Sequence, residues 1–109
     1  MMLTQNEQQQ VAKTIFKQMG GTNKLSAMIG ANNFAFGTNQ DQEIYVTFRF
    51  KVSKVANQVR ITLNHSDTYT MEFFKIRGTN VKAIEKISMV YCDQLIKFFE
   101  NTTKLYLSL

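Results

Sequence analysis

Several residue types that constrain a fold or a chemistry are scarce in this sequence. Its 109 residues include no proline, no tryptophan, one cysteine and one histidine. The absence of proline excludes a Pro-rich linker, and the chain is close to the commonest size of a single domain. Apolar residues make up 44% and charged residues 19%, which is ordinary for a globular protein and excludes a typical disordered one. We therefore predict one domain spanning residues 1–109.

The single cysteine and the lack of long apolar runs bear on the compartment. Cys92 cannot form a disulfide within the chain, which favours a reducing environment. The polar opening segment MMLTQNEQQQ lacks the basic and apolar regions of a signal peptide. No apolar run approaches the roughly 20 residues that span a bilayer. We expect a cytoplasmic protein with no membrane partner.

Acidic residues are missing from two long stretches, and each of these is basic. The net charge is +5, which permits binding to nucleic acid or other anions but does not establish it. Residues 44–66 contain no acid and hold Arg49, Lys51, Lys54 and Arg60. Residues 73–84 contain no acid and hold Lys75, Arg77 and Lys82. The distribution of charge therefore predicts a basic surface.

The N-terminal segment predicts two helices. Thr4 and Glu7 match a capping box, in which the Thr4 hydroxyl accepts the Glu7 N–H and the Glu7 side chain reaches back. Apolar residues then recur at helical spacing as far as Gly20-Gly21, and glycine commonly ends a helix. We predict a helix over about residues 5–19 and a short helix over about residues 23–29.

After Gly30 the apolar period changes to two, which is the period of a half-buried strand. The clearest alternation is that of Ile44, Val46, Phe48, Phe50 and Val52. The pattern predicts strands over about residues 32–37, 43–52, 58–64 and 68–77. Short connections between consecutive strands favour an antiparallel meander.

Strand register can be predicted from the residues that share a face. The register that we favour keeps the apolar residues together by placing Phe48 opposite Ile61. It also sets Arg49 opposite Arg60, although like charges that face each other across strands are mildly unfavourable. In the next hairpin, the corresponding register sets Arg60 opposite Glu72.

Phe73 and Phe74 interrupt the alternation of the fourth predicted strand. A β-bulge at this point would keep both phenylalanines in the core while Lys75 and Arg77 point to solvent. Tyr45 is then the one aromatic residue that we expect on the open face of the sheet.

The C-terminal segment predicts a helix over about residues 81–104. Its apolar residues cover about half of a helical wheel, more than is usual for a surface helix. They form two stripes: Ile84, Ile87, Tyr91, Leu95 and Phe98, beside Met89, Cys92, Ile96 and Phe99. This helix either contacts both the sheet and the first helix or forms a homodimer, and Cys92 is expected to be a buried thiol. The final LYLSL adds a strand or packs as an apolar tail.

The predicted fold class is α+β, with the order α-α-β-β-β-β-α. A four-stranded antiparallel sheet carries the N-terminal and C-terminal helices on one face and leaves the other face open. Cations and hydroxyls on rigid strands can contact phosphates. The predicted nucleic-acid site consists of Tyr45, Arg49, Lys51, Arg60, Lys75 and Arg77. The alternative is a solvated polar face whose threonines reflect strand propensity.

No arrangement typical of catalysis or of metal binding occurs in the sequence. His65 lies in a predicted turn beside Asp67, without a nucleophile or metal partner nearby in the pattern. Gly20-Gly21, with Lys24, lacks the spacing of a phosphate loop. We therefore predict a protein that is not an enzyme and that has no catalytic residues, no metal site and no cofactor.

Three stretches resemble a known group of proteins. NQVRITLNHSDTYTMEFFKIRG, together with VYCDQL and FFENTTKLYLSL, resembles small, largely uncharacterised proteins encoded by bacteriophages and other mobile elements. MIGANNF is similar to their MxGAKNF motif, and Cys92 stands where small residues are common. The resemblance runs from about Leu25 onward. It implies a phage or plasmid origin and action in the cytoplasm of a host bacterium, and it transfers no functional residues.

These observations lead to one functional hypothesis and two alternatives. The hypothesis is a small non-catalytic accessory protein of phage or mobile-element type that binds nucleic acid through a basic sheet face. The first alternative is an inhibitor or modulator of a host defence system that binds a host protein, which the resemblance and the wide apolar face of the last helix favour. The second alternative is a minor structural or assembly protein.

Overall fold

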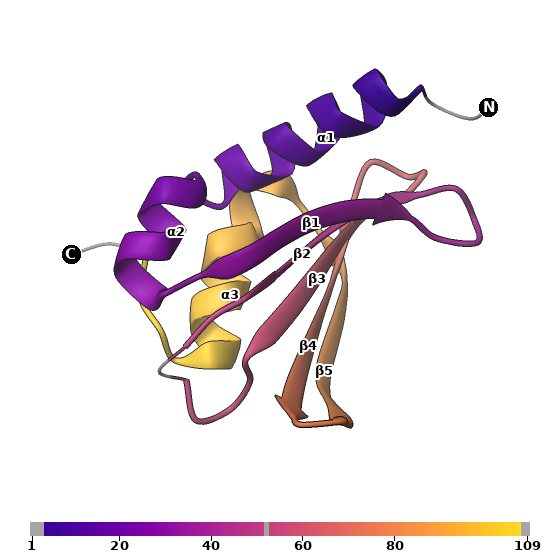
Figure 1. Cartoon of the computed structure of the whole chain (residues 1–109). Helices are drawn as coiled ribbons and strands as arrows, with labels where there is room; N and C mark the ends of the chain where they lie inside the picture. The colour runs from indigo at the N-terminus through magenta and orange to yellow at the C-terminus, as the bar shows by residue number, and fades with distance from the viewer. Residues whose placement is uncertain (1–3, 52, 108–109) are drawn as a thin grey trace.

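Five antiparallel strands form a meander sheet, and three helices lie on one of its faces (Figure 1). The computed structural model describes residues 4–51 and 53–107. Its elements are α1 (Gln5–Gln18), α2 (Thr22–Ile29), β1 (Asn32–Thr38), β2 (Ile44–Arg49), β3 (Gln58–Leu63), β4 (Tyr69–Arg77), β5 (Asn80–Val90), a 3₁₀ turn (Cys92–Gln94) and α3 (Leu95–Thr103). The α+β class and the antiparallel sheet are confirmed, but the sheet has five strands rather than the four predicted.

The two N-terminal helices begin and end where local chemistry predicts. The Glu7 N–H donates to the Thr4 hydroxyl at 3.2 Å, and the Glu7 carboxylate accepts the Thr4 N–H at 3.2 Å. This reciprocal capping satisfies donors that the first turn of α1 leaves open. α2 ends at Gly30, whose φ of 64° is left-handed and favours glycine.

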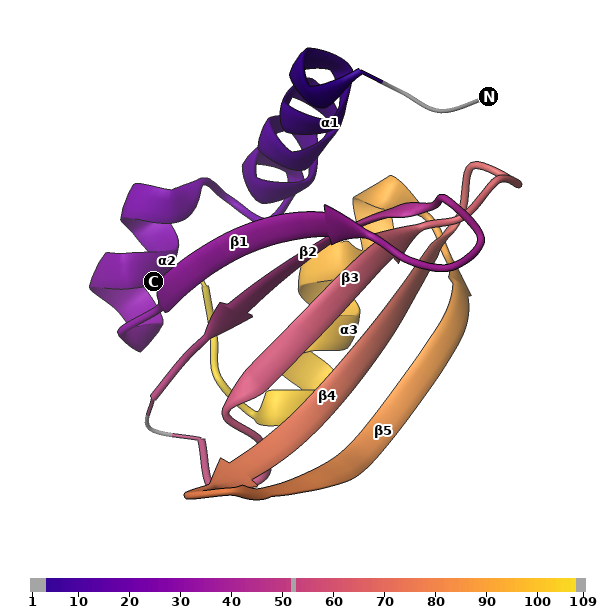
Figure 2. The same ribbon diagram turned by 45° about the vertical axis from the view of Figure 1, so that its right-hand side comes forward.

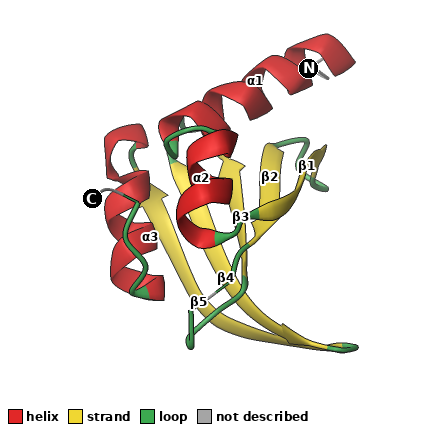
Figure 3. Cartoon of the chain, turned by 60° about the vertical axis from the view of Figure 1, so that its left-hand side comes forward, coloured by secondary structure: helices red, strands yellow, loops and turns green. Residues whose placement is uncertain are grey.

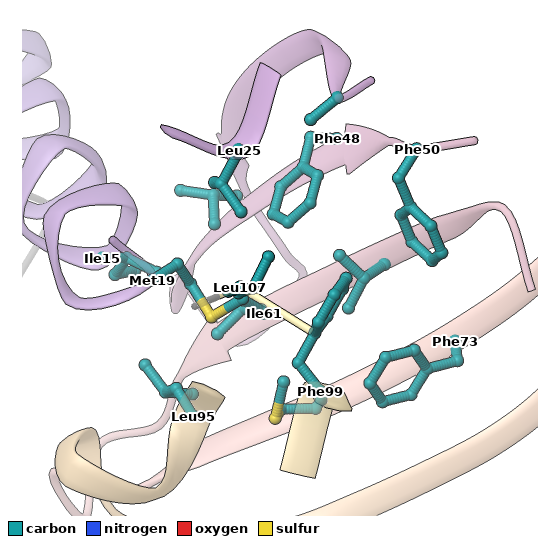
Figure 4. Packing of buried hydrophobic residues seen from close by; sticks show 14 of the residues in the cluster. Ile15, Met19, Leu25, Phe48, Phe50, Ile61, Phe73, Leu95, Phe99 and Leu107 are labelled. Carbon is teal, nitrogen blue, oxygen red and sulfur yellow. The ribbon is translucent and has the colours of Figure 1, made fainter. Parts of the chain in front are cut away.

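The core lies between the helices and the inner face of the sheet, and it contains a cluster of phenylalanine rings among aliphatic side chains (Figure 4). Phe99 of α3 is at its centre, with ring centroids 5.1 Å from Phe50, 6.0 Å from Phe73 and 6.1 Å from Phe48. All four side chains are buried. Rings of this size contribute much of the burial energy of a small domain, so α3 is held to β2 and β4 mainly through this cluster.

The predicted helix over about residues 81–104 is wrong for its first half, which forms the edge strand β5. β5 pairs with β4 through two bulges: Phe73 and Phe74 pair with Glu85 and Ala83, and Met71 pairs with Ile87. Each bulge adds a residue to β5 and breaks its period of two. Consequently Ile84, Ile87 and Val90 all pack against the core at a spacing of three, which imitates a helix. The homodimer alternative depended on a wide apolar face of this predicted helix. The described residues do not form that face, because residues 80–90 are a strand.

The predicted pairing of β2 with β3 is wrong by two residues. Arg49 lies opposite Gln58, and Thr47 lies opposite Arg60, so the two arginines do not face each other. Because a shift of two residues preserves which side chains face inward, the apolar pattern alone cannot distinguish these registers. The observed register places a neutral residue opposite Arg60 and removes the repulsion. The predicted pairing of Arg60 with Glu72 is confirmed.

The predicted bulge at Phe73 and Phe74 exists, but its extra residue is in β5 and not in β4. β4 therefore keeps its alternation, and the prediction that Phe74 lies in the core is wrong. Phe74 pairs with Gln58 and shares the open face of the sheet with it. Lys75 and Arg77 consequently lie on the same side of β4 as buried Phe73, the opposite side from the one predicted.

The remaining predictions for single residues have mixed outcomes. Cys92 is exposed, not buried, because it lies in the 3₁₀ turn that follows β5. Of the two alternatives for the C-terminal LYLSL segment, its described residues 105–107 form the packed tail: Leu107 is buried, and its N–H donates to the Glu100 carboxylate at 2.7 Å. Residues 108–109 lie outside the described part of the chain. Val52, the predicted last apolar residue of the second strand, lies outside the described residues, and β2 ends at Arg49.

Candidate nucleic-acid interface

One face of the sheet is not covered by helices, and we call it the outer face. Figure 2 shows this face in front, with α3 behind the strands. Its side chains alternate with the core residues along the three central strands. They are Tyr45, Thr47 and Arg49 of β2, Gln58, Arg60 and Thr62 of β3, and Thr70, Glu72 and Phe74 of β4. Lys86 of β5 continues the row of Thr47, Arg60 and Glu72.

A stacked pair of side chains occupies the middle of the outer face. The Arg60 guanidinium carbon lies 4.5 Å from the centroid of the Tyr45 ring, a distance at which a cation and an aromatic face attract each other. Gly37 of β1, opposite Tyr45, makes room for the ring. A Cβ atom at Gly37 would lie 2.7 Å from the Tyr45 hydroxyl oxygen, so a glycine is required for this packing.

Arg60 has no hydrogen-bond acceptor among the described residues. Its Nε is buried and unpaired, and Glu72 forms no ion pair with it although the two are cross-strand neighbours. A guanidinium presents five N–H donors in a fixed plane. The Tyr45 ring therefore holds Arg60 in position while leaving its donors without a partner in the described protein.

The stacked pair also forms one wall of a cavity. Tyr45 and Arg60 line an open cavity of about 470 Å³ together with Thr38 at the end of β1 and residues 39–41 of the loop between β1 and β2. The loop is held by Asn39, whose side-chain oxygen accepts the Asp41 N–H at 3.0 Å and the Glu43 N–H at 2.9 Å. The polar residues Thr38, Gln40 and Asp41 thus line the cavity beside an aromatic ring and a guanidinium. Such groups can pair with the edges of a nucleic-acid base.

Three of the six predicted site residues come together on the outer face. Tyr45 and Arg60 are stacked, and Arg49 is exposed at the end of β2. Lys51 lies beyond β2, where its N–H donates to Ile29 at 2.9 Å. The Lys51 stem packs over Gly30, so this lysine is at the margin of the sheet and not in the rows of the outer face.

Lys75 and Arg77 do not belong to the outer face. They line an open pocket of about 400 Å³ at the free end of the β4–β5 hairpin, together with Lys54 and Lys82. We call this second site the basic pocket. The loop between β2 and β3 closes it on one side, where the Lys75 ammonium lies 3.5 Å from the Ser53 carbonyl oxygen. The predicted basic surface is therefore two separate surfaces on opposite faces of the sheet.

Sequence reasoning missed four residues of these surfaces. Phe74 and Lys86 lie on the outer face, and Lys54 and Lys82 lie in the basic pocket. Lys54 and Lys82 both occur in the acid-free stretches. The sequence therefore indicated that they belong to basic segments, but not that they lie together in one pocket. Phe74 was hidden by the assumption that the bulge belongs to β4.

Comparisons with known protein families, curated proteins and solved structures gave no match. The resemblance to phage-encoded proteins therefore stays a prediction. Among the described residues, no helix is long and apolar enough to cross a membrane. The same part of the chain contains no group of three or more histidine, cysteine or acidic side chains placed to hold a metal ion.

Proposed function

We propose that this protein is a non-catalytic accessory protein of phage or mobile-element type that binds single-stranded nucleic acid through the outer face, in the cytoplasm of a host bacterium. The observation that carries the proposal is the Arg60–Tyr45 pair, in which an arginine without an acceptor among the described residues lies over an aromatic ring. Proteins that bind single strands combine cations for the backbone with aromatic rings for the bases.

The surroundings of the pair fit one nucleotide and its neighbours. The cavity beside Tyr45 and Arg60 is a shallow hollow, open to solvent, with polar residues of the β1–β2 connection along it. Arg49 lies one row away on the same face and offers a second phosphate contact. Phe74 shares the row of Arg49 and Gln58 and adds a partly exposed aromatic side chain. A stacked base near Tyr45 with its backbone on the two arginines is therefore the binding mode that we propose.

The test is binding of fluorescent single-stranded and double-stranded oligonucleotides at about 50 and 200 mM salt, the range over which phosphate contacts are detected. The variant Arg49→Gln/Arg60→Gln removes two proposed contacts. Its matched control, Lys13→Gln/Lys17→Gln, changes the charge equally at two exposed positions of α1. We expect tight single-strand binding by the wild type, weaker binding by the arginine variant and nearly unchanged binding by the control.

The salt dependence gives a sharper criterion than affinity alone. Each phosphate contact to a single strand contributes about 0.7 to the slope of log K against log salt, so losing two should reduce the slope by about 1.4. Equal losses in the arginine variant and the α1 control would mean that only net charge matters. An absence of binding at low salt would contradict the proposal.

A second candidate function is binding of a protein partner, the alternative that the sequence left open. It is favoured by apolar residues at the far end of the outer face, where Ile76 pairs with Val81 and Phe74 pairs with Ala83. Val81 is 63% exposed. Val81→Lys should abolish capture of such a partner from a bacterial lysate and leave oligonucleotide binding intact.

A further inference from the structure

The backbone segments that carry the basic pocket are held in place by a tight turn and by hydrogen bonds. The β4–β5 hairpin that carries Lys75, Arg77 and Lys82 extends beyond the helices (Figure 3). Its two-residue turn begins with Gly78, whose φ of 58° suits the first central position of a type II′ turn. This turn fixes the register in which Lys75 lies directly opposite Lys82.

The opposite wall of the pocket is anchored to α3. The Ser53 hydroxyl donates to the Thr103 carbonyl oxygen at 2.9 Å and accepts the Val55 N–H at 3.1 Å. These bonds hold the segment that contains Lys54 against the end of α3. Asn57 fixes the other end of the loop, because its side-chain amide donates to the Ile76 carbonyl and accepts the Ile76 N–H, both at 2.8 Å. Two separately anchored backbone segments therefore carry the four cations around an open pocket.

The charge of the pocket is not compensated by the described protein. None of the described residues that line it is acidic, and Glu85, the next acid along β5, is outside the lining. Lys75 and Lys82 are cross-strand neighbours, a placement of like charges that destabilises a hairpin. The one acceptor found for the Lys75 ammonium, the Ser53 carbonyl, is at 3.5 Å, a long distance for a hydrogen bond.

We propose that the basic pocket binds a multiply charged phosphate group. Four cations around one pocket exceed what a single carboxylate would neutralise, whereas phosphate groups carry more charge and several acceptor oxygens. Arg77 can bind two phosphate oxygens in its fixed plane, and the three lysines act as point charges around them. The group can belong to a free polyphosphate compound or to the backbone of a nucleic acid. The site lies on the face opposite to Arg60, so the inference does not depend on the proposed function.

The first arm of the test is calorimetric titration of the full chain with inorganic tripolyphosphate at low salt. Arg77→Gln/Lys82→Gln removes two pocket cations that are both exposed, so the fold should persist, which circular dichroism verifies. Lys13→Gln/Lys17→Gln on α1 is the matched control. We expect tripolyphosphate to bind the wild type and the control alike and to bind the pocket variant at least about tenfold more weakly, since two charge-assisted contacts are lost.

The second arm measures a labelled single-stranded oligonucleotide with the same proteins and with tripolyphosphate as competitor. Loss of tripolyphosphate binding alone in the pocket variant identifies a free polyphosphate as the ligand. Loss of oligonucleotide binding, with competition by tripolyphosphate, identifies the nucleic-acid backbone. The proposal is overturned if the pocket variant and the control behave alike in both arms, or if the wild type binds neither probe. The variant Arg49→Gln/Arg60→Gln in the same assays shows whether oligonucleotide binding depends on the outer face, separately from its dependence on the pocket.

Discussion

The Arg60 guanidinium lies over the Tyr45 ring and not beside Glu72, although Glu72 is its cross-strand neighbour. The arginine is therefore directed toward the ring of Tyr45. Tyr45 is itself limited by Gly37 on β1, where a side chain would meet the phenol. Arg60 of β3 contacts Tyr45 of β2, and Tyr45 contacts Gly37 of β1. Each of these two contacts can be tested separately.

The first prediction concerns the Tyr45 ring. Tyr45→Leu keeps an apolar side chain in the strand but removes the aromatic face, so single-strand binding should weaken by about 1–3 kcal/mol. Tyr45→Phe retains the stack and should bind within about twofold of the wild type, a difference well below that range. Fluorescence anisotropy with one oligonucleotide measures both. Equal weakening in the two variants would show that the hydroxyl, not the ring, makes the contact.

The second prediction concerns Gly37. Gly37→Ala would place a methyl group 2.7 Å from the Tyr45 hydroxyl oxygen and 3.0 Å from Cζ, so the ring must move. We expect a loss of about 1–3 kcal/mol in the free energy of unfolding, as in other overpacked sites. In a Tyr45→Leu background the same change should have much less effect. Urea unfolding of the four proteins measures the coupling, and additive losses would contradict the proposed contact.

The third prediction tests which face of β2 is inside. Phe48 is fully buried and contacts the ring of Phe99, whereas neighbouring Thr47 lies on the outer face opposite Arg60. Phe48→Asp should prevent folding because it buries an unpaired charge. Thr47→Asp should leave a folded protein of nearly unchanged stability. Circular dichroism and urea unfolding distinguish them, and a stable Phe48→Asp protein would invert the assignment of the faces.

The central strands were predictable because apolar and polar residues alternate along them without interruption. In β2 and β3, alternation from Ile44 and from Gln58 indicates both the strand and its buried face. β5 breaks that rule at its two bulges, so Ile84, Ile87 and Val90 reach the core at a spacing that predicts a helix. The position of a bulge depends on how β5 pairs with β4. The local sequence of β5 carries no information about that pairing.

The candidate site was predictable in composition but not in arrangement. Arg60 and Tyr45 were expected on one face, and they share it. Their contact depends on a register that differs by two residues from the one predicted, and inward-facing residues are the same in both. The division of Lys75 from Arg49 onto opposite faces depends on which strand carries the bulge. Both features come from pairing between distant segments.

The fourth prediction concerns Asn57, which extends the β3–β4 ladder with its side chain. Its amide makes two hydrogen bonds of 2.8 Å to the backbone of Ile76, and its own N–H donates to the Phe74 carbonyl at 2.9 Å. Asn57→Ala should lower the free energy of unfolding by about 1–3 kcal/mol, since both partly buried backbone groups lose a partner. Asn101→Ala, at an exposed position of α3, is the control and should change stability little. A change in Asn57→Ala as small as that of the control would show that water satisfies the Ile76 groups in its place.

The last prediction concerns the alkaline limit of stability. Tyr69 is buried, and its hydroxyl donates to the Gln18 side-chain oxygen at 2.7 Å. Burial raises the pKa of the Tyr69 phenol above its ordinary value of 10.0, with a smaller contribution from nearby Cys92. The folded protein therefore holds this proton more tightly than the unfolded chain. Stability should be fully present below about pH 9, should fall as the unfolded phenol ionises near pH 10, and should level off above the folded pKa.

Tyr69→Phe separates this effect from other alkaline changes. The variant loses the hydrogen bond to Gln18 and should be less stable at neutral pH by about 1 kcal/mol. Its stability should nevertheless fall less steeply between about pH 9 and 11, since the residue that titrates differently in the two states is gone. Tyr106→Phe, at a side chain that is 66% exposed, should retain the wild-type slope. Urea unfolding across this range measures the three slopes, and an unchanged slope in Tyr69→Phe would place the alkaline sensitivity elsewhere in the protein.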